Sequence, residues 1–360
     1  MATGAPQSLA MDETDGSTHF ASGVRRDRWI LIGVAAIFTV FIALLASKGI
    51  NGLRPSNYLG NLAVYAATLF LFVLPFGARE LLRDRPDRPI AYLQDLAARN
   101  RVGARFMSGL PMLLALILYM PAFSAMKSAI PLFNTYGWDQ FWIQADIAIH
   151  GTDPWRILQP VLGYPYVTSA ISLAYHAWIM LIYAGGVFFC FFVSDERLRH
   201  RYFIAYFGIW TIIGVVFATM FASVGPCFLD LIAGDHHFDD LMAYLYEANT
   251  VAPVLVLDVQ EQLLYWHLTG SHGLGRGITA MPSMHVAMAL LFALAIRQYS
   301  RRLGYVFFAF FLVIMIASVH LSYHYAVDGY VSIIATLAIW KISAFLAGKP
   351  APRRKSNLAA

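Results

Sequence analysis

Long apolar segments constrain this 360-residue chain more than any other feature. A hydrocarbon layer about 30 Å thick requires roughly 20 apolar residues in a helix that rises about 1.5 Å per residue. The hydrophobic share of 59% and the charged share of 13% leave too few polar side chains to cover a soluble fold. The sequence therefore predicts an all-α, polytopic transmembrane helix bundle of about eight spans. The predicted spans are 29–46, 58–77, 106–126, 166–193, 202–223, 281–296, 304–320 and 325–346.

The basic residues are distributed unevenly between alternate connections of these spans. One set of connections, which includes both termini, carries 21 of the 26 Lys and Arg side chains. Because Lys and Arg near span ends are retained on the cytoplasmic side, this asymmetry predicts that both termini are cytoplasmic. The net charge of +5 is then explained by membrane orientation, so no nucleic acid partner is expected. The five basic residues of the opposite, outer set are Lys48, Arg54, Lys127, Arg156 and Arg276.

Composition divides the chain into five regions. The first is polar and acidic and lacks the basic start of a signal peptide, so it is predicted to be a disordered cytoplasmic tail. The second holds three spans and a charged segment, 79–105, that fits either an interfacial helix or a solvated loop. The third is an outer loop resting on the membrane, the fourth holds the last five spans, and the fifth is a basic cytoplasmic tail. In chain order the regions are 1–24, 25–126, 127–165, 166–346 and 347–360.

The strongest group of polar residues lies at the outer ends of the last three spans, beginning with the segment MPSMH, 281–285. Pro282 fits the first turn of a helix, where its missing N–H would be unpaired anyway. The N–H groups that follow carry the positive end of the helix dipole and form an anion site. Ser283 would add a hydroxyl to that site, and His285 would hand a proton to the bound group. Alone, the segment also fits an ordinary helix start with a histidine at the interface.

A second group follows in the segment HYAVD, 324–328. His324 and Asp328 are four residues apart, so on a helix they share a face and the carboxylate can accept a hydrogen bond from one ring nitrogen. That contact presents the other nitrogen outward and stabilises the imidazolium formed when it attacks an electrophile. The alternative is a structural His–Asp pair at a helix end. Because the last two spans are joined by a short loop, His285 and His324 are expected at the same outer face, where the two segments together fit phosphoryl transfer.

These residues resemble the type-2 phosphatidic acid phosphatase superfamily, in which a Pro-Ser-x-His segment is followed by His-x-x-x-Asp. The HYAVD segment and its spacing from His285 resemble the inositol phosphorylceramide synthase (inositolphosphotransferase) branch in particular. The resemblance covers mainly the last five spans and implies a six-helix, phosphatase-like catalytic core. It implies that His324 is the nucleophile that becomes phosphorylated, that Asp328 orients it, and that His285 protonates the leaving oxygen.

Two features of that superfamily are absent. The Lys that precedes an Arg-Pro pair has no counterpart, since the nearest segment, 79–86, has another spacing and lies on the cytoplasmic side. The Ser-Arg pair before the second histidine is replaced by Ala317 and Ser318, and the synthase branch resembles this sequence in lacking that Arg. Arg276 is the only basic residue of the second long outer loop, so it is the candidate phosphate ligand beside Ser283, with a headgroup-facing arginine as the alternative. The nearby segment 223–228 is expected to contact lipid or its head group.

Two other interpretations stay open. His320, His324 and Asp328 fall at i, i+4 and i+8, a spacing that could bind a metal with His285, although HExxH is absent and no metal or cofactor is predicted. A membrane transporter or lipid-binding scaffold, with a His/Asp proton relay, is the non-catalytic alternative. The prediction is a lipid phosphotransferase or lipid phosphate phosphatase, with its site on the periplasmic, extracellular or lumenal side. Its substrate would be a phospholipid, lipid phosphate or sphingolipid-like molecule, and the long outer loops favour head-group transfer over hydrolysis.

Overall fold

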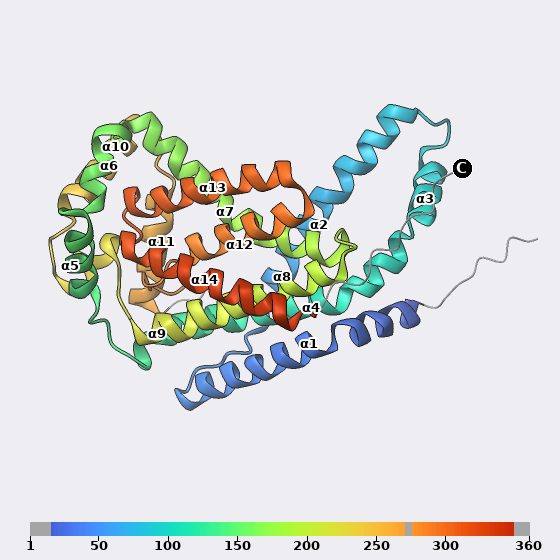
Figure 1. Cartoon of the computed structure of the whole chain (residues 1–360), viewed down its shortest axis with the longest axis horizontal. Helices are drawn as coiled ribbons and strands as arrows, with labels where there is room; N and C mark the ends of the chain where they lie inside the picture. Colours follow the sequence, from blue (N-terminus) through green and yellow to red (C-terminus); the bar gives the residue numbers. More distant parts are fainter. Residues whose placement is uncertain (1–15, 271–275, 349–360) are drawn as a thin grey trace, which may run out of the picture.

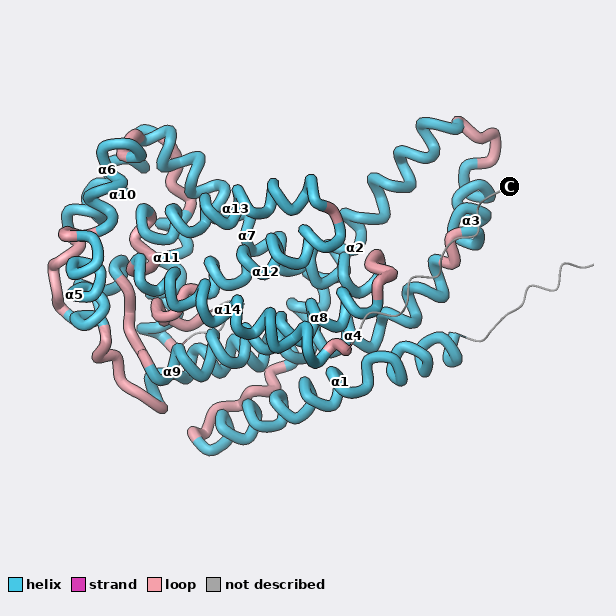
Figure 2. Tube along the Cα trace, viewed as in Figure 1, coloured by secondary structure: helices cyan, strands magenta, loops and turns pink. Residues whose placement is uncertain are grey.

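The computed structural model describes residues 16–270 and 276–348, and within these residues the chain is helical with no strand (Figure 1, Figure 2). Seven helices are long and apolar enough to cross a membrane, and an eighth apolar helix, α12 (Met284–Tyr299), is shorter. The eight follow the predicted spans in order, which confirms the all-α membrane bundle and a multi-pass chain. The seven are α1 (Gly16–Ser47), α2 (Pro55–Asp84), α4 (Val102–Ala129) with η1 (Ile130–Leu132), α7 (Pro165–Phe191), α8 (Glu196–Gly208) continued by η2 (Ile209–Phe217) and α9 (Ala218–Met220), α13 (Arg301–His320) and α14 (Ala326–Leu346).

Shorter helices occupy the connections. Several of them gather at one end of the bundle, and α3 lies at the opposite end (Figure 1). Of the two interpretations of segment 79–105, the structure has the helical one, because α2 runs on to Asp84 and α3 follows it. The shorter elements are α3 (Pro89–Arg99), α5 (Asp139–His150), α6 (Pro154–Leu162), η3 (Pro226–Phe228), η4 (Leu229–Ala233), α10 (Asp239–Val251) and α11 (Val256–Thr269).

Helix α1 begins earlier than the sequence predicts. Residues 16–24, assigned above to a disordered tail, are helical, so that part of the prediction is wrong. The reason is tertiary: α1 packs along α4, and at Gly23 an added Cβ would lie only 2.2 Å from the carbonyl oxygen of Ser108. Residues 1–15 of the predicted N-terminal tail and 349–360 of the predicted C-terminal tail lie outside the described residues.

Local sequence explains the boundaries of several helices. Ser283 begins α12 as its N-cap, where its hydroxyl oxygen accepts a hydrogen bond from the Val286 N–H at 3.4 Å. α5 ends at Gly151, whose φ of 79° is a conformation that glycine adopts without strain. Pro111 and Pro121 do not interrupt α4, which continues through both.

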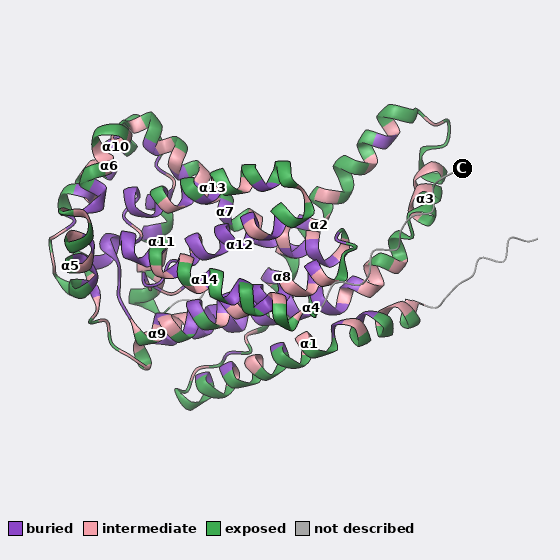
Figure 3. Ribbon diagram, viewed as in Figure 1, coloured by how far each residue is buried: buried purple, intermediate pink, exposed green. Residues whose placement is uncertain are grey.

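Helix α12 lies at the centre of the bundle, packed by α7, α8, α13 and α14 (Figure 3). Eleven of its 16 residues are buried, so protein surrounds it on nearly every side. By contrast, α1, α2, α13 and α14 expose many large apolar side chains, as expected of faces that meet lipid. The end of α12 that carries His285 is therefore held by surrounding helices.

A buried ion-pair cluster joins the beginnings of α1 and α8. The Asp27 carboxylate contacts Arg199 Nη1 at 2.5 Å, His200 Nε2 at 3.0 Å and Arg26 Nη2 at 3.2 Å. Asp27 and Arg199 are each 1% exposed. Two helices far apart in the sequence are thus linked by a buried ion pair, Asp27–Arg199.

Candidate active site

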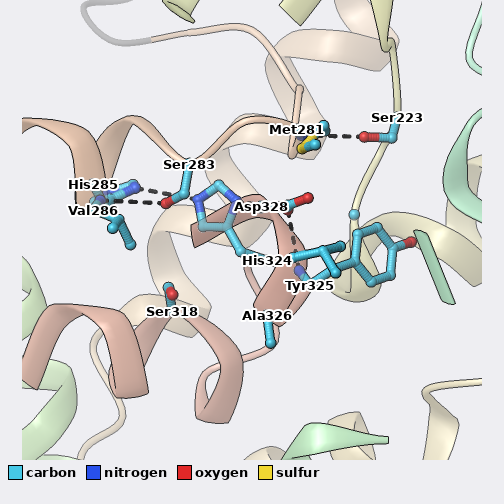
Figure 4. A network of polar contacts seen from close by, with 12 residues as sticks. Ser223, Met281, Ser283, His285, Val286, Ser318, His324, Tyr325, Ala326 and Asp328 are labelled. Atoms are coloured by element: carbon cyan, nitrogen blue, oxygen red, sulfur yellow. Dashed lines mark hydrogen bonds and ion pairs between the residues drawn. The ribbon is translucent and has the colours of Figure 1, made fainter. Parts of the chain in front are cut away.

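The three candidate catalytic residues meet where α12 and α14 begin (Figure 4). His324 precedes α14, Asp328 lies in the first turn of α14, and His285 lies in the first turn of α12. His324 Nδ1 is 3.2 Å from Asp328 Oδ2, and His324 Nε2 is 3.4 Å from His285 Nδ1. The structure therefore brings together residues that are 39 positions apart in the chain.

The His324–Asp328 pair is fixed and desolvated. With its proton on Nδ1, His324 donates to Asp328 Oδ2, which also accepts the Tyr325 N–H at 3.1 Å. Burial, and to a smaller extent the positive charge of Lys127, lowers the pKa of His324 to about 3. The ring is neutral near pH 7, and its Nε2, which carries the lone pair, faces His285 Nδ1 at the cavity.

Aromatic side chains of α7 set the orientation of His285. The imidazole stacks on Tyr175, with ring centroids 4.3 Å apart, and its centroid is 4.1 Å from that of Trp178. Trp178 Nε1–H also donates to the His285 carbonyl oxygen at 3.0 Å. Sequence reasoning missed both aromatics, although their spacing of three residues indicates a shared helix face.

A cavity of about 640 Å³ includes both histidines in its wall. Its polar lining includes His285, His324, Arg276 and Lys127. Side chains of α11 line the same cavity, so this helix forms part of its cover. The cavity joins the polar groups to an apolar space of the kind that a lipid chain fills. Apolar lining residues include Met120, Phe123, Ile179, Ile182, Leu263 and Trp266.

Two cations line the cavity. Arg276 was the expected phosphate ligand, and burial, followed by the charge of Arg54, lowers its pKa. Lys127, at the end of α4, was not expected in the site, although the sequence marks it as one of few outer basic residues. The backbone beside Arg276 lies against it, since a Cβ added at Gly277 would be 2.9 Å from the Lys127 carbonyl carbon. Gly277 has a φ of 105°, so glycine allows this close approach.

Ser283 is placed differently from the phosphate-ligand prediction. Its side chain is fully buried and is not part of the cavity lining. The hydroxyl caps α12, and the Ser283 N–H is 3.4 Å from the Asp328 carbonyl oxygen. Through these contacts Ser283 links α12 to α14.

The segment 223–228 supports the backbone around the two histidines. Ser223 Oγ accepts the Met281 N–H at 3.2 Å, and the Cys227 N–H donates to the Ser322 carbonyl oxygen at 2.8 Å. The Phe228 ring lines the cavity. The segment thus lies between the chain that precedes α12 and the loop that precedes α14, with two apolar residues, Val224 and Phe228, at the cavity.

The metal-binding alternative is not supported by the geometry. His320 Nε2 is 2.9 Å from Thr168 Oγ1, and among the described residues His320 is not grouped with His324 and Asp328 as ligands. In the described ranges, the one cluster of potential ligand atoms lies elsewhere and is exposed. That cluster is Asp230, His236 and Asp239.

Comparison with known proteins yields one match. Residues 143–342 match the family model of the PAP2 superfamily, which covers more than half of the chain and includes His285, His324 and Asp328. No curated protein and no solved structure matches the chain significantly.

Proposed function

This chain belongs to the PAP2 superfamily, whose members are phosphatases or phosphotransferases, and we propose that it transfers a phospho-head group of a membrane lipid through a phosphohistidine on His324. The observation that carries the proposal is the His324–Asp328 pair, with His285 beside it, on the wall of a cavity that also contains Arg276 and Lys127. An oriented neutral imidazole, a proton donor and two cations are groups that phosphoryl transfer uses.

The proposed reaction has two steps. His324 Nε2 attacks phosphorus, the N–P bond forms, and the bond from phosphorus to the leaving oxygen breaks. Asp328 stabilises the resulting positive charge on the ring, and His285 gives a proton to the leaving oxygen. The acceptor hydroxyl then attacks phosphorus and passes its proton to His285 as the N–P bond breaks. Arg276 and Lys127 offset the negative charge on the other phosphate oxygens.

Three features support a lipid donor and transfer to an alcohol in place of hydrolysis. The apolar lining continues from the histidines toward α4 and α7, where a lipid chain would lie. Side chains of α11 line the cavity beside the histidines, and a site lined in this way would reduce the access of water, which competes with an acceptor alcohol. Ala317 and Ser318 stand where the phosphatases carry Ser-Arg, which fits the inositolphosphotransferase branch. The site is proposed to face the periplasm, the cell exterior or a lumen, because the arginine-rich connections lie at the other end of the bundle (Figure 1).

The test is transfer of labelled phosphate from a panel of phospholipids and lipid phosphates by the purified protein, with and without acceptor alcohols. We expect label to move in the wild type and in His236→Ala, which removes an exposed histidine of the outer region. His324→Ala is expected to abolish transfer and also the acid-labile, alkali-stable phosphoenzyme trapped during turnover. Equal activity in His324→Ala would refute the nucleophile assignment. Label appearing only as inorganic phosphate would refute transfer and leave hydrolysis.

A further inference from the structure

Helix α5 contributes two buried carboxylates to the segment that carries the nucleophile. Asp139 and Asp146 are 6% and 3% exposed and are seven residues apart, so they lie on the same face two turns from each other. Buried carboxylates are energetically unfavourable unless hydrogen-bond donors surround them. Each of these carboxylates is surrounded by donors from the loops and helix ends at the histidine site.

Asp146 supplies the cap that α14 lacks. Tyr325 is the N-cap residue of α14 and has no short side-chain oxygen to accept the first free N–H groups. The Asp146 carboxylate accepts both of them, from Ala326 at 2.7 Å and from Val327 at 2.9 Å. These two residues lie between His324 and Asp328, so the carboxylate holds the turn that separates the nucleophile from its partner.

Asp139 contacts both the loop that carries His324 and the segment at Gly225 that packs against this loop. It accepts the Tyr325 hydroxyl at 2.8 Å, and its other contacts are the N–H groups of Val224 at 3.0 Å and Gly225 at 2.9 Å. The segment at Gly225 approaches closely, because a Cβ there would lie 2.9 Å from the Tyr323 carbonyl oxygen. Tyr323 and Tyr325 flank His324, so Asp139 holds Tyr325 directly and holds the Gly225 segment that packs against Tyr323.

We propose that α5 is a positioning element for the proposed reaction, in which Asp146 and Asp139 hold His324 and Asp328 in the geometry required for attack on phosphorus. Neither carboxylate lines the cavity, so neither contacts the substrate. Their effect acts through the backbone of 324–328, where a displacement of about 1 Å is enough to reduce a rate about 100-fold. The inference rests on the proposed function, because it assigns these residues to the same site.

The experiment compares kcat, KM and thermal stability of Asp146→Ala, Asp146→Asn and Tyr325→Phe with the wild type. Asp146→Ala is expected to lower kcat about 10- to 100-fold with KM within about twofold, because binding groups are untouched while the nucleophile is misplaced. Asp146→Asn retains one acceptor oxygen, so its kcat is expected to lie between those of Asp146→Ala and the wild type. Tyr325→Phe removes only the hydroxyl that reaches Asp139, so it tests the second contact in a chain that keeps its packing. Asp240→Ala, which removes an exposed acid of α10, is the matched control with unchanged kcat.

Two results would overturn the inference. One is an unchanged kcat in folded Asp146→Ala together with an unchanged kcat in Tyr325→Phe. The other is a fall in kcat in Asp146→Ala that parallels the fall in thermal stability and is equally large in Asp146→Asn. That pattern would indicate a folding role alone. Amide hydrogen exchange over 322–330 separates this inference from the proposed function, because it needs no substrate. Faster exchange at Ala326 and Val327 in Asp146→Ala supports the contact even if the wild type turns over no phosphoester, whereas unchanged exchange refutes it.

Discussion

The ion-pair cluster at Asp27 allows a quantitative test of how α1 is held in the bundle. Asp27→Ala removes the carboxylate that contacts Arg199 Nη1 and His200 Nε2. The Arg199 side chain is 2% exposed, and among the described residues its remaining hydrogen bond is from Nε to the Phe189 carbonyl oxygen at 3.1 Å. Loss of the partner of a buried charge destabilises a protein by about 3–5 kcal/mol. Because the Arg199 guanidinium also lies over the Phe203 ring, we expect a loss of stability near the lower end of this range, about 3 kcal/mol.

The assay is reversible unfolding in mixed detergent and denaturant, followed by circular dichroism. Asp87→Ala removes an exposed acid, gives the same change in net charge, and is expected to change stability by no more than about 0.5 kcal/mol. The double variant Asp27→Ala/Arg199→Met removes both charges and should recover at least half of the loss, because no buried cation is left without a partner. The reasoning is refuted if Asp27→Ala is as stable as Asp87→Ala, or if adding Arg199→Met deepens the loss.

Two further predictions concern helix packing and pH. Gly23→Ala is expected to destabilise the chain by about 1–3 kcal/mol, because its Cβ would collide with the Ser108 carbonyl oxygen. Gly33→Ala lies on the same helix with no atom within 4 Å of the added Cβ, so it is expected to stabilise the chain by about 0.5–1 kcal/mol. The same unfolding assay compares the two variants, and equal changes in stability would contradict the packing of α1 on α4. Burial lowers the pKa of His324 to about 3 from 6.5, so the stability contributed by its neutral ring is present above pH 6.5 and is lost as the pH falls toward 3. Between pH 7 and 4.5 the wild type should lose about 2–3 kcal/mol more than His324→Gln, and parallel losses would argue against a desolvated imidazole.

The helices could be predicted from the sequence because membrane spans depend on a local property, the length of an apolar run. All eight predicted spans correspond to helices, including the short helix α12. The start of α1 could not be predicted, because residues 16–24 look polar and small in isolation. Their order comes from contact with α4, and the fit of Gly23 against Ser108 is visible only in three dimensions.

In the candidate site, too, local spacing predicts some of the residues and only the three-dimensional structure reveals the others. His285, His324 and Asp328 are marked by spacing along the chain, and the structure places them within hydrogen-bond range of one another. Lys127 and Asp146 are each an ordinary charged residue of an outer connection in the sequence. Their partners lie well over one hundred positions away, so no local pattern links them to the histidines.

The functional unit therefore extends beyond the part of the chain that matches the family. The match begins at residue 143, yet Lys127 and Asp139 lie before it, and Asn61 of α2 lines the cavity. A chain that began at residue 143 would keep His324 and its partners but would lose one cation, one restraint on the Tyr325 loop, and the cavity wall formed by α2 and α4. Two of the first three spans, α2 and α4, are therefore best explained as part of the proposed site. They form a wall of the cavity in which the proposed phosphohistidine would form, and α4 carries Lys127, one of the two cations, to it.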